Sequence, residues 1–549
     1  MANCNTEKGT APVPATVPKW AAPQQRSRKL TMLGLIAISM LWVHASWRFL
    51  GLDRHTCNHV QSEDEWREYS GENVKWKLCG NITGHDVECG TIHVPMDQFS
   101  EDKSLSKNFS IPLIRMRGKN ATKNLMLNPG GPGGSGSYLI YSDGEPLNTI
   151  LGEEFHLISF DPRGVNESRP LASCYPDNDT RKRLRHGPLK DLIKDSPNLH
   201  AWTANFLQPC KDNMGEYLQY INTAQTAADM NSILDALGQE KMLYWGFSYG
   251  TILGQVYATM YPERSERIVI DGVANQFQWF NDLISDEDFF DTNKVYHGFF
   301  DECVKAGDAC PLSKFAKTAP ELAEKTTRFI NNLRSKPLSV YLADRLAKLL
   351  DGNATDAFIA YGQGDTFSSL IQAHPPQRLP NWSKHWRQDR LDLLEKLLPF
   401  FDANFFARTE QELYYMKQQW DIPSTNNYTP KRGVVTAHPL LVVSTTYDPV
   451  CPLVSAQSAR DAFNGSRIIE VKGYGHCSLA KPSVCAGKYI RDYLSTGALP
   501  DTDVQCEIDG NYFPGEGDND AAFDKEKYSI EDLELLAAQT KLSSLVSII

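Results

Sequence analysis

Short apolar runs alternate with amphipathic segments through the middle of the chain. The run 242–247 is apolar and aromatic, and the pattern 252–261 that follows it is helical. Another apolar run, 267–271, begins after Pro262 ends this helical pattern. Helix, strand, helix and strand in this order predict a parallel α/β unit. The first helix is predicted from four apolar residues that share one face: Met230, Ile233, Leu234 and Leu237.

Further apolar runs extend the predicted sheet on both sides of this unit. The runs 124–128 and 155–161 precede it and indicate buried strands. Residues 87–94 and 109–116 alternate loosely and predict an antiparallel hairpin ahead of them. After a long interval, the apolar run 439–444 resumes the core. We therefore expect a protein of the α/β class, with a mostly parallel sheet flanked by helices.

Two insertions separate these strands. Residues 169–225 are polar and contain Cys174 and Cys210, which indicates an excursion over the surface. Residues 276–432 are rich in helical patterns and in aromatic side chains. An insertion of this kind between core strands is typical of a helical cap, and most of its aromatic residues are expected to pack against one another.

These patterns divide the chain into six predicted parts. The last part is acidic and ends in a short amphipathic helix, which a capping-box pattern at Ser529–Asp532 opens. The predicted boundaries are 1–29 for a disordered cytosolic tail, 30–50 for a transmembrane signal anchor, 51–275 for the first part of the core, 276–432 for the cap, 433–510 for the second part of the core and 511–549 for the acidic tail and helix.

The predicted membrane segment contains no Lys, Arg, Asp or Glu from Leu30 to Trp47, which corresponds to about 27 Å of helix. Basic residues crowd its N-terminal side, which predicts a single-pass membrane protein with that side in the cytosol. The alternative is a cleaved signal peptide, with Val43 and Ala45 before the cut, and a secreted protein. In both cases the bulk of the chain enters the secretory lumen or the extracellular space.

The sequons and the cysteines agree with that location. Nine N-x-S/T sequons occur, and all of them follow the membrane segment. Of twelve cysteines only Cys4 precedes it, and this distribution suggests several disulfides in an oxidising compartment. The predicted glycosylation sites are Asn81, Asn108, Asn120, Asn166, Asn178, Asn353, Asn381, Asn427 and Asn464. Close spacing favours the pairs Cys79–Cys89, Cys303–Cys310 and Cys477–Cys485, with buried free thiols as the alternative for each.

Charge and spacing exclude several classes of function. The net charge is −11, and beyond the first thirty residues the one basic cluster is 181–185, so nucleic-acid binding is not expected. No metal-ligand spacing such as H-E-x-x-H occurs, and no metal or other cofactor is expected. The expected partners are a peptide or small-molecule substrate and, through one N-terminal helix, a membrane.

The most informative motif lies between the predicted strand 242–247 and the helix that follows. Gly246, Ser248 and Gly250 form the pattern G-x-S-x-G, which between a strand and a helix is typical of a nucleophile elbow. Such a turn presents its serine at the edge of the sheet, and a Cβ at either glycine would collide with the neighbouring strand or helix. We therefore predict Ser248 as a nucleophile, with a glycine-rich structural turn as the alternative.

A serine hydroxyl needs a base, and the base needs a carboxylate that orients it. On α/β folds with such an elbow, the carboxylate and then the histidine follow the serine along the chain. Asp448 follows a buried strand directly, at the carboxyl end where α/β sites are built. His476 lies in a glycine-flanked loop after the strand-like run 467–471, whereas the other later histidines fall in the cap or before a strand. The predicted catalytic residues are Ser248, Asp448 and His476.

The oxyanion of a tetrahedral intermediate needs two backbone N–H donors. One is expected from Tyr249, the residue after the serine. The other is expected from the loop 129–136, which has five glycines in eight residues and lets a substrate approach the backbone. Gly131 is our first choice and Gly130 the second. A phosphate-binding loop is rejected, because this loop lacks the required lysine.

Five motifs stand out along the predicted core: Asn128–Gly136, Asp161–Gly164, Gly246–Thr251, Asp448–Pro452 and Gly475–His476. Together they resemble the α/β-hydrolase serine peptidases of the tripeptidyl aminopeptidase and proline iminopeptidase group, over roughly residues 75–510. The resemblance implies an α/β-hydrolase fold with a helical cap and removal of short pieces from peptide N-termini. The chain departs from that pattern in its membrane segment, in its extended tail, and in Cys451 and Cys477 beside the predicted acid and base.

The expected function is a membrane-anchored serine hydrolase, in particular an aminopeptidase that works through an acyl-enzyme. An esterase or amidase acting on a small non-peptide molecule is the alternative, and an inactive scaffold on the same fold is a third hypothesis. An aminopeptidase must bind a free α-ammonium group, and Asp286, Glu287 and Asp288 at the start of the cap are candidate carboxylates. The alternative for this acidic run is a solvated helix N-terminus.

Overall fold

The computed structural model describes residues 66–100, 107–184, 195–282, 286–335, 415–417, 419–423, 425–426, 428–513 and 528–546. The predicted cytosolic tail and transmembrane segment lie outside these residues. None of the helices in the described ranges combines the length and the apolar character that a membrane span requires. The chain from Glu65 onward forms one compact unit.

One mixed sheet organises this unit. Its strands in the described residues are β1 (Trp66–Arg67), β2 (Trp76–Ile82), β3 (His85–Pro95), β4 (Asn108–Met116), β5 (Lys123–Asn128), β6 (Phe155–Phe160), β7 (Met242–Phe247), β8 (Ser265–Asp271), β9 (Leu441–Tyr447), β10 (Arg467–Tyr474) and β11 (Val504–Glu507). They lie in the order β1-β2-β3-β4-β6-β5-β7-β8-β9-β10-β11. Neighbours are antiparallel from β1 to β6 and parallel from β6 to β11, which confirms the predicted hairpin and the mostly parallel sheet.

The helices between these strands follow the predicted alternation. In the described residues they are α2 (Gly136–Leu151), α3 (Asn178–Leu184), α4 (Ser196–Met214), α5 (Thr223–Ala236), α6 (Tyr249–Met260), α7 (Gln276–Asn281), α8 (Thr292–Ala306), α9 (Ala319–Ser335), α15 (Leu453–Ala462), α16 (Val484–Thr496) and α18 (Ile530–Val546). Short 3₁₀ helices are η1 (Gly215–Tyr220), η2 (Pro262–Arg264), η3 (Asp286–Phe289), η4 (Gly307–Ala309), η5 (Ser313–Phe315) and η6 (Ser478–Ala480).

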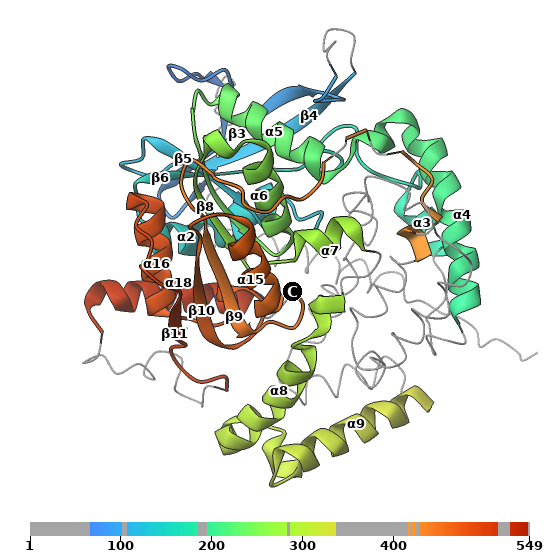
Figure 1. Ribbon diagram of the computed structural model, residues 1–549, viewed down its shortest axis with the longest axis vertical. Helices are drawn as coiled ribbons and strands as arrows, with labels where there is room; N and C mark the ends of the chain where they lie inside the picture. The colour runs from blue at the N-terminus through green and yellow to red at the C-terminus, as the bar shows by residue number, and fades with distance from the viewer. Residues whose placement is uncertain are drawn as a thin grey trace, which may run out of the picture. The chain divides into compact units, whose positions relative to one another are not determined.

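The parallel strands are apolar on both faces because helices cover both sides of the sheet. In β7, Met242 and Tyr244 pack on one side in a cluster with residues of α5, α6 and α15. Leu243 and Trp245, which alternate with them, pack on the other side with residues of α2, α16 and α18. Figure 1 shows these two groups of helices on opposite sides of the strands. The result is a three-layer α/β architecture, as the sequence predicts.

The insertion between β8 and β9 is helical where the structure describes it, through α7, α8 and α9. Residues 336–414 of the predicted cap lie outside the described part. Phe300, Cys303 and Leu322 belong to a small apolar cluster of α8 and α9 that is separate from the two clusters of the sheet. The rings of Tyr296 and Phe300 meet edge to face at 5.1 Å. These aromatic residues therefore pack within the insertion, as expected from the sequence.

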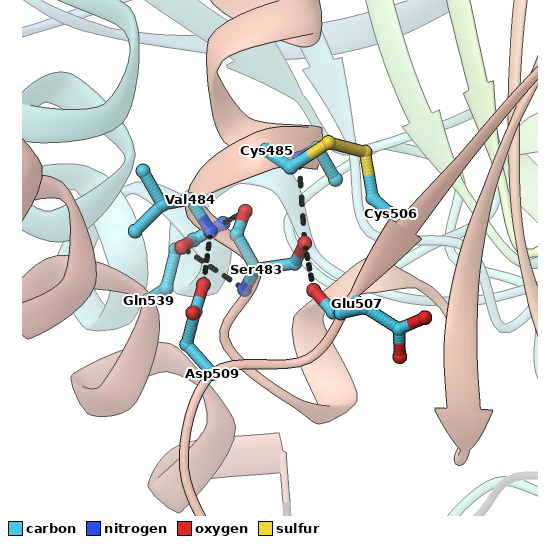
Figure 2. The surroundings of a disulfide bond; sticks show 8 residues. Ser483, Val484, Cys485, Cys506, Glu507, Asp509 and Gln539 are labelled. Carbon is cyan, nitrogen blue, oxygen red and sulfur yellow. Dashed lines mark hydrogen bonds between the residues drawn. A yellow bond between two sulfur atoms is a disulfide. The ribbon is translucent and has the colours of Figure 1, made fainter. Parts of the chain in front are cut away.

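Four disulfides occur in the described residues, and they join Cys79 to Cys89, Cys174 to Cys210, Cys303 to Cys310 and Cys485 to Cys506. The first and third confirm predicted pairs. The predicted pair Cys477–Cys485 is wrong, since Cys477 is free and buried. Spacing favoured the nearer cysteine, but Cys485 lies in the first turn of α16 and faces β11, where Cys506 stands (Figure 2). Closing this 21-residue separation contributes about 3 kcal/mol to stability in the loop-entropy treatment.

The terminal helix α18 docks beside this disulfide (Figure 2). Gln539 exchanges two hydrogen bonds with the backbone of Ser483, the N-cap of α16: its Nε2 donates to the carbonyl oxygen at 3.0 Å and its Oε1 accepts from the N–H at 3.2 Å. The helix opens as predicted, because the N–H of Asp532 donates to Oγ of Ser529 at 3.1 Å. Its leucines complete the contact, and the buried ones are Leu535, Leu536 and Leu542. The C-terminal helix is therefore an integral layer of the core.

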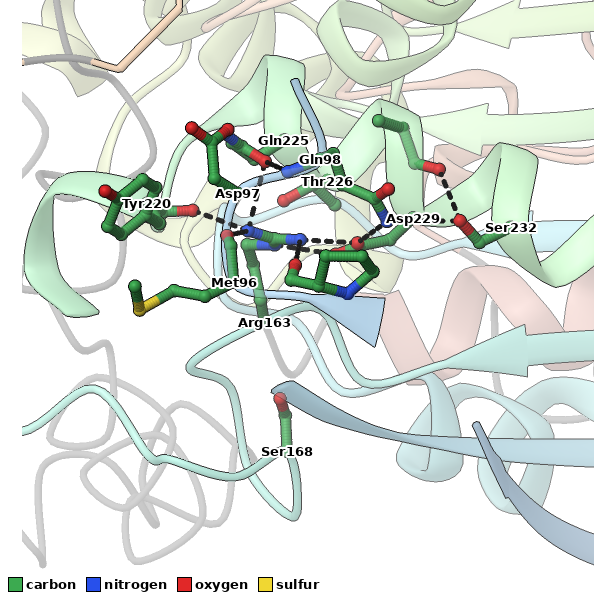
Figure 3. Close-up of polar contacts among 12 residues, drawn as sticks. Met96, Asp97, Gln98, Arg163, Ser168, Tyr220, Gln225, Thr226, Asp229 and Ser232 are labelled. Atoms are coloured by element: carbon green, nitrogen blue, oxygen red, sulfur yellow. Dashed lines mark hydrogen bonds and ion pairs between the residues drawn. The ribbon is translucent and has the colours of Figure 1, made fainter. Parts of the chain in front are cut away.

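Arg163, in the motif Asp161–Gly164, is fully buried and holds several segments together (Figure 3). Its guanidinium forms a two-atom ion pair with Asp229 of α5, with Nε 2.7 Å from Oδ2. It also donates to the carbonyl oxygens of Met96 at 2.8 Å and Tyr220 at 2.9 Å. A buried guanidinium is stable only where an acceptor or an opposite charge meets each of its N–H donors. We therefore assign Arg163 in this motif a structural role and not a substrate contact.

Candidate active site

Ser248 lies on the sharp turn between β7 and α6, as the elbow motif predicts. Its φ of 55° and ψ of −123° are unusual for a residue with a Cβ, which is the strained backbone of a nucleophile elbow. A Cβ on Gly246 would lie 2.6 Å from the carbonyl oxygen of Gly250. A Cβ on Gly250 would lie 2.9 Å from the carbonyl oxygen of Asn128 in β5. Both glycines are therefore required by close backbone approach.

Asp448 and His476 meet at the carboxyl ends of β9 and β10. Nδ1 of His476 lies 2.8 Å from Oδ2 of Asp448 and 3.0 Å from Oδ1. The carboxylate is fully buried, and three backbone N–H groups donate to it, from Val450 at 3.0 Å, Cys451 at 2.8 Å and Cys477 at 3.1 Å. These donors hold the ionised carboxylate in place, and the carboxylate in turn fixes the orientation of the imidazole.

The pair also sets the basicity of the imidazole. Burial lowers the pKa of His476, but the charge of Asp448 and its hydrogen bond outweigh that effect and hold the pKa well above the usual 6.5. The side chain of His476 keeps 28% of its surface exposed, so the imidazole is reachable from outside. The imidazole therefore has a raised proton affinity and is accessible from outside.

Ser248 and the histidine loop are fastened to the same backbone atom. The N–H of Ser248 donates to the carbonyl oxygen of Asp271 at 3.0 Å, and the thiol of Cys477 donates to that oxygen at 3.4 Å. The hydroxyl of Ser248 makes no hydrogen bond with any described residue, including His476. Contacts between nucleophile and base are often long in unliganded hydrolases and tighten when a substrate binds. The structure thus brings all three predicted residues to one edge of the sheet and joins two of them directly.

The glycine-rich loop after β5 lies against the elbow. A Cβ on Gly130 would be 3.0 Å from Cβ of Ser248 and 3.1 Å from the backbone nitrogen of Tyr249. The N–H of Gly130 is donated to Oδ1 of Asn128 at 3.0 Å, which favours Gly131 as the loop's donor to an oxyanion. The loop's far end is fixed because Oγ of Ser135, the N-cap of α2, donates to the buried carboxylate of Asp161 at 2.8 Å.

The sequence did not single out the side chain of Asp271. This fully buried carboxyl, at the end of β8, accepts from the N–H of Ser478 at 2.8 Å and from its hydroxyl at 2.6 Å. Burial raises the pKa of Asp271 to about 6, although these hydrogen bonds and the one from Trp245 oppose the shift. Its position at the carboxyl end of a buried strand, like that of Asp448, is the signal that could have found it.

The three acidic residues at the start of the cap, Asp286, Glu287 and Asp288, have different surroundings. Oε2 of Glu287 accepts from Nδ2 of Asn275 at 2.7 Å and from Oγ of Ser455 at 3.2 Å, so this carboxylate links the cap to α15. Burial raises the pKa of the Cys451 thiol, and the charges of Asp448 and Asp288 raise it further. Asp288 is the residue after Glu287 in η3 and is half-buried. The side chain of Asp286 lies outside the described part.

Cys451 and Cys477 are free thiols on either side of Asp448. Burial raises the pKa of the Cys477 thiol to about 11, despite the opposing effect of His476. A carboxylate oxygen of Asp448, the sulfur of Cys451 and a ring nitrogen of His476 lie within 4.8 Å of one another. In the described residues, this is the group whose donor atoms are close enough to share one cation.

The predicted glycosylation sites differ in their surroundings. Asn166 donates its Nδ2 to Oδ2 of Asp161 at 2.8 Å, so that amide already has a structural role. Asn178 belongs to α3, without a described side chain, and the sequons at Asn353, Asn381 and Asn427 lie outside the described residues. The exposed asparagines among these sequons are Asn81, Asn108, Asn120, Asn166 and Asn464. All nine sequons stay predicted glycan sites.

The family model of the alpha/beta hydrolase fold matches residues 123–481 of this chain. The match covers the sheet from β5 to β10, the elbow, and the loops of Asp448 and His476. The chain therefore belongs to the α/β-hydrolase fold family.

Relatives of known classification extend this comparison. The serine protease Hip1 of Mycobacterium tuberculosis is 27% identical over 489 residues, which covers 80% of this chain and 90% of that protein. The tripeptidyl aminopeptidase of Streptomyces coelicolor is 26% identical over 487 residues, with 79% and 86% coverage. Carboxylesterase B of Mycobacterium tuberculosis is 26% identical over 481 residues, with 78% and 89% coverage. The predicted resemblance to the serine peptidase group is confirmed by the first two matches.

Asp271→Asn tests the buried carboxyl through the pH dependence of stability. The folded protein keeps this proton up to about pH 6, whereas an ordinary aspartate releases it near 3.8, so the group's stabilising contribution falls as pH rises through this window. We expect the free energy of unfolding of the wild type to fall relative to Asp271→Asn by up to about 3 kcal/mol between about pH 4 and about pH 7. Urea unfolding at both pH values measures it. The exposed Asp461→Asn is the control, and parallel pH profiles for wild type and Asp271→Asn would contradict the assignment.

Proposed function

We propose that this protein is a serine peptidase in which Ser248, His476 and Asp448 form a catalytic triad. The observation that carries the proposal is the buried Asp448–His476 pair, at 2.8 Å, on the same edge of the sheet as a serine in an elbow conformation. The resemblance to serine protease Hip1 and to tripeptidyl aminopeptidase supports peptide bonds as the target. No cofactor is needed for this chemistry.

The geometry supports an acyl-enzyme mechanism. His476 accepts the proton of the Ser248 hydroxyl through Nε2 as the oxygen attacks the carbonyl carbon, because Nδ1 is held by Asp448. The N–H groups of Tyr249 and Gly131 stabilise the oxyanion, each such donor being worth about 3–4 kcal/mol. His476 then protonates the leaving amine, and water, activated by the same imidazole, hydrolyses the ester on Ser248.

Within this class we propose an aminopeptidase that releases short peptides or residues from N-termini. A buried or partly desolvated carboxylate is the usual means of binding an α-ammonium group. Asp288, a half-buried residue of η3 at the start of the cap, is the candidate. Its neighbour Glu287 links the cap to α15 through Asn275 and Ser455. The tripeptidyl aminopeptidase relative supports this specificity.

An esterase or amidase is the second candidate function. The similarity to carboxylesterase B favours it, and a triad that cleaves amides also cleaves esters. The two functions differ in one property, since only an aminopeptidase discriminates for a free N-terminal ammonium group.

We also propose that residues 30–50 anchor the protein in a membrane, with the catalytic part in the secretory lumen or outside the cell. The alternative of a secreted protein applies if that segment is cleaved. Four disulfides in the described residues support an oxidising compartment. The exposed sequons at Asn81, Asn108, Asn120 and Asn464 are compatible with glycosylation there.

The triad predicts non-additive losses. Ser248→Ala should reduce kcat by a factor of about 10⁴ or more, and adding His476→Ala should cost little further, because the two residues act in one step. A fluorophosphonate probe should label the wild type and not Ser248→Ala. Ser543→Ala, in α18, is the matched control and should keep both activity and labelling. Losses that multiply would show that one of the two residues is wrongly assigned.

Acetylation of the substrate separates the two candidate functions. Acetylating the N-terminus of a good tripeptide-amide substrate should lower kcat/KM by about 30- to 5000-fold, because about 2–5 kcal/mol of a desolvated charge pair is lost. Asp288→Asn should lower kcat/KM for the free peptide and leave the acetylated one nearly unchanged. Asp301→Asn, an exposed carboxylate on α8, is the control. Equal cleavage of both peptides by the wild type would favour the esterase or amidase.

Membrane topology is tested in sealed microsomes. Protease added from outside should leave the large C-terminal portion intact, because the membrane protects a lumenal domain. A glycosidase that removes N-linked glycans should lower its mass, measured by gel electrophoresis. Detergent before the protease is the control for protection. Complete digestion of the bulk in sealed vesicles would refute the proposed orientation.

A further inference from the structure

We propose that Asp448, Cys451 and His476 form a binding site for Zn²⁺ or a similar thiophilic divalent cation, and that the bound cation inhibits the hydrolase. The site itself rests on the geometry of these three residues. Its inhibitory consequence rests on the proposed function, because it requires His476 to be the base.

The three donor atoms are close to the spacing that one ion needs. A carboxylate oxygen of Asp448, the sulfur of Cys451 and a ring nitrogen of His476 lie within 4.8 Å of one another. Tetrahedral Zn²⁺, with bonds of about 2.0–2.3 Å, places its ligand atoms about 3.3–3.6 Å apart. Side-chain movements of about 1 Å therefore convert this group into a coordination shell. Three protein ligands leave the fourth tetrahedral position for water.

The ligand types select the ion. One sulfur, one imidazole nitrogen and one carboxylate oxygen suit Zn²⁺ and related metals, whereas Mg²⁺ and Ca²⁺ prefer oxygen ligands throughout. The buried carboxylate of Asp448 also supplies a negative charge at the site. A dication reverses the sign of the local field and stabilises the thiolate that it binds.

Cys451 and Cys477 differ in what surrounds their sulfur atoms. Both are buried free thiols whose N–H groups hold Asp448. The sulfur of Cys477, however, donates to the carbonyl oxygen of Asp271 at 3.4 Å, and it packs so closely on Gly272 that a Cβ there would collide with it. Cys451 is the thiol whose sulfur shares the space between the acid and the base.

The proton balance explains the inhibition. Binding exchanges the thiol proton of Cys451, released to solvent, for a sulfur–metal bond. Nδ1 of a neutral His476, which now donates to Asp448, becomes a metal ligand, and its proton moves through water to Nε2. The imidazole then carries its one proton on the nitrogen that must accept the proton of Ser248. The base is blocked, and one proton is released for each ion that binds the protein with a neutral His476.

Zinc binding is measured on the full-length Ser248→Ala variant, which keeps the cluster and hydrolyses nothing. Isothermal titration with ZnCl₂ should show a site that weakens at least about 10- to 100-fold in Ser248→Ala/Cys451→Ser, since a bond to the metal is lost. Ser248→Ala/Cys477→Ser is the matched control and should bind within about threefold of Ser248→Ala. Equal zinc affinity with and without Cys451, or no binding, would overturn the site.

Cobalt gives a second readout that does not need a Cys451 variant to fold. Co²⁺ added to Ser248→Ala should produce the intense thiolate-to-metal charge-transfer absorption of a Co–S bond, and excess Zn²⁺ should remove it. Absence of this band would overturn the proposal even if Cys451→Ser is unstable. These measurements do not involve peptide cleavage, so their failure is distinct from a failure of the proposed function.

Inhibition is then measured on the wild type with its best substrate. Zn²⁺ should abolish turnover, and a chelator should restore it. The inhibition should depend on Cys451, so Cys451→Ser should need at least about 10-fold more Zn²⁺ for the same fractional inhibition. Equal sensitivity of wild type and Cys451→Ser, with zinc binding at the cluster established, would overturn the inhibitory role and leave the metal site.

Discussion

The candidate site depends on one buried carboxylate, that of Asp448. A carboxylate removed from water is costly unless hydrogen bonds replace the lost solvation. Three backbone N–H groups and the imidazole of His476 supply those bonds. Because one of the N–H groups belongs to Cys477, satisfying Asp448 also fixes the loop that carries His476. The basicity of the imidazole follows from the same contact, since the unscreened negative charge stabilises its protonated form.

A buried aspartate that accepts hydrogen bonds from a loop also occurs at the carboxyl ends of two other strands. Asp161 directly after β6 and Asp271 at the end of β8 are fully buried, like Asp448 directly after β9. Asp161 accepts from Ser135 and so anchors the glycine-rich loop, whereas Asp271 accepts from Ser478 and so anchors the histidine loop. Each carboxylate lies at a carboxyl end of the sheet and accepts from a loop that forms the site. Asp161, Asp271 and Asp448 therefore position the loops around the proposed catalytic residues.

This concentration of acids has an electrostatic consequence. Burial raises the pKa of Asp271 to about 6, and it also raises the pKa of the Cys451 and Cys477 thiols beside Asp448. A site that holds an unbalanced negative charge attracts a positive partner. The imidazolium of His476, the α-ammonium group of the proposed substrate and the proposed thiophilic dication are three such partners, and Cys451 distinguishes the third because it adds a sulfur ligand.

The sequence by itself determined the elements, the elbow and the order of the chemical groups. Apolar runs and helical faces are local patterns, so the strands β5 to β10 and the helices α5 and α6 could be predicted from them, and G-x-S-x-G between strand and helix identified the position of Ser248. Asp448 and His476 could be chosen because their places after strands are also visible in the sequence.

Only the tertiary structure decided which distant groups meet. The partner of Cys485 was mispredicted because spacing along the chain does not show which Cβ atoms face each other, and β11 brings Cys506 beside α16. Asp271 was overlooked as a functional side chain because its partner, Ser478, is about two hundred residues away in sequence and reaches it through the packing of β8, β9 and β10. Likewise, the acidic tail gave no sign that α18 is part of the core, since Gln539 finds Ser483 only when the sheet has formed. Local patterns specify strands and helices, but contacts between them depend on strand order, which arises from packing the whole chain at once.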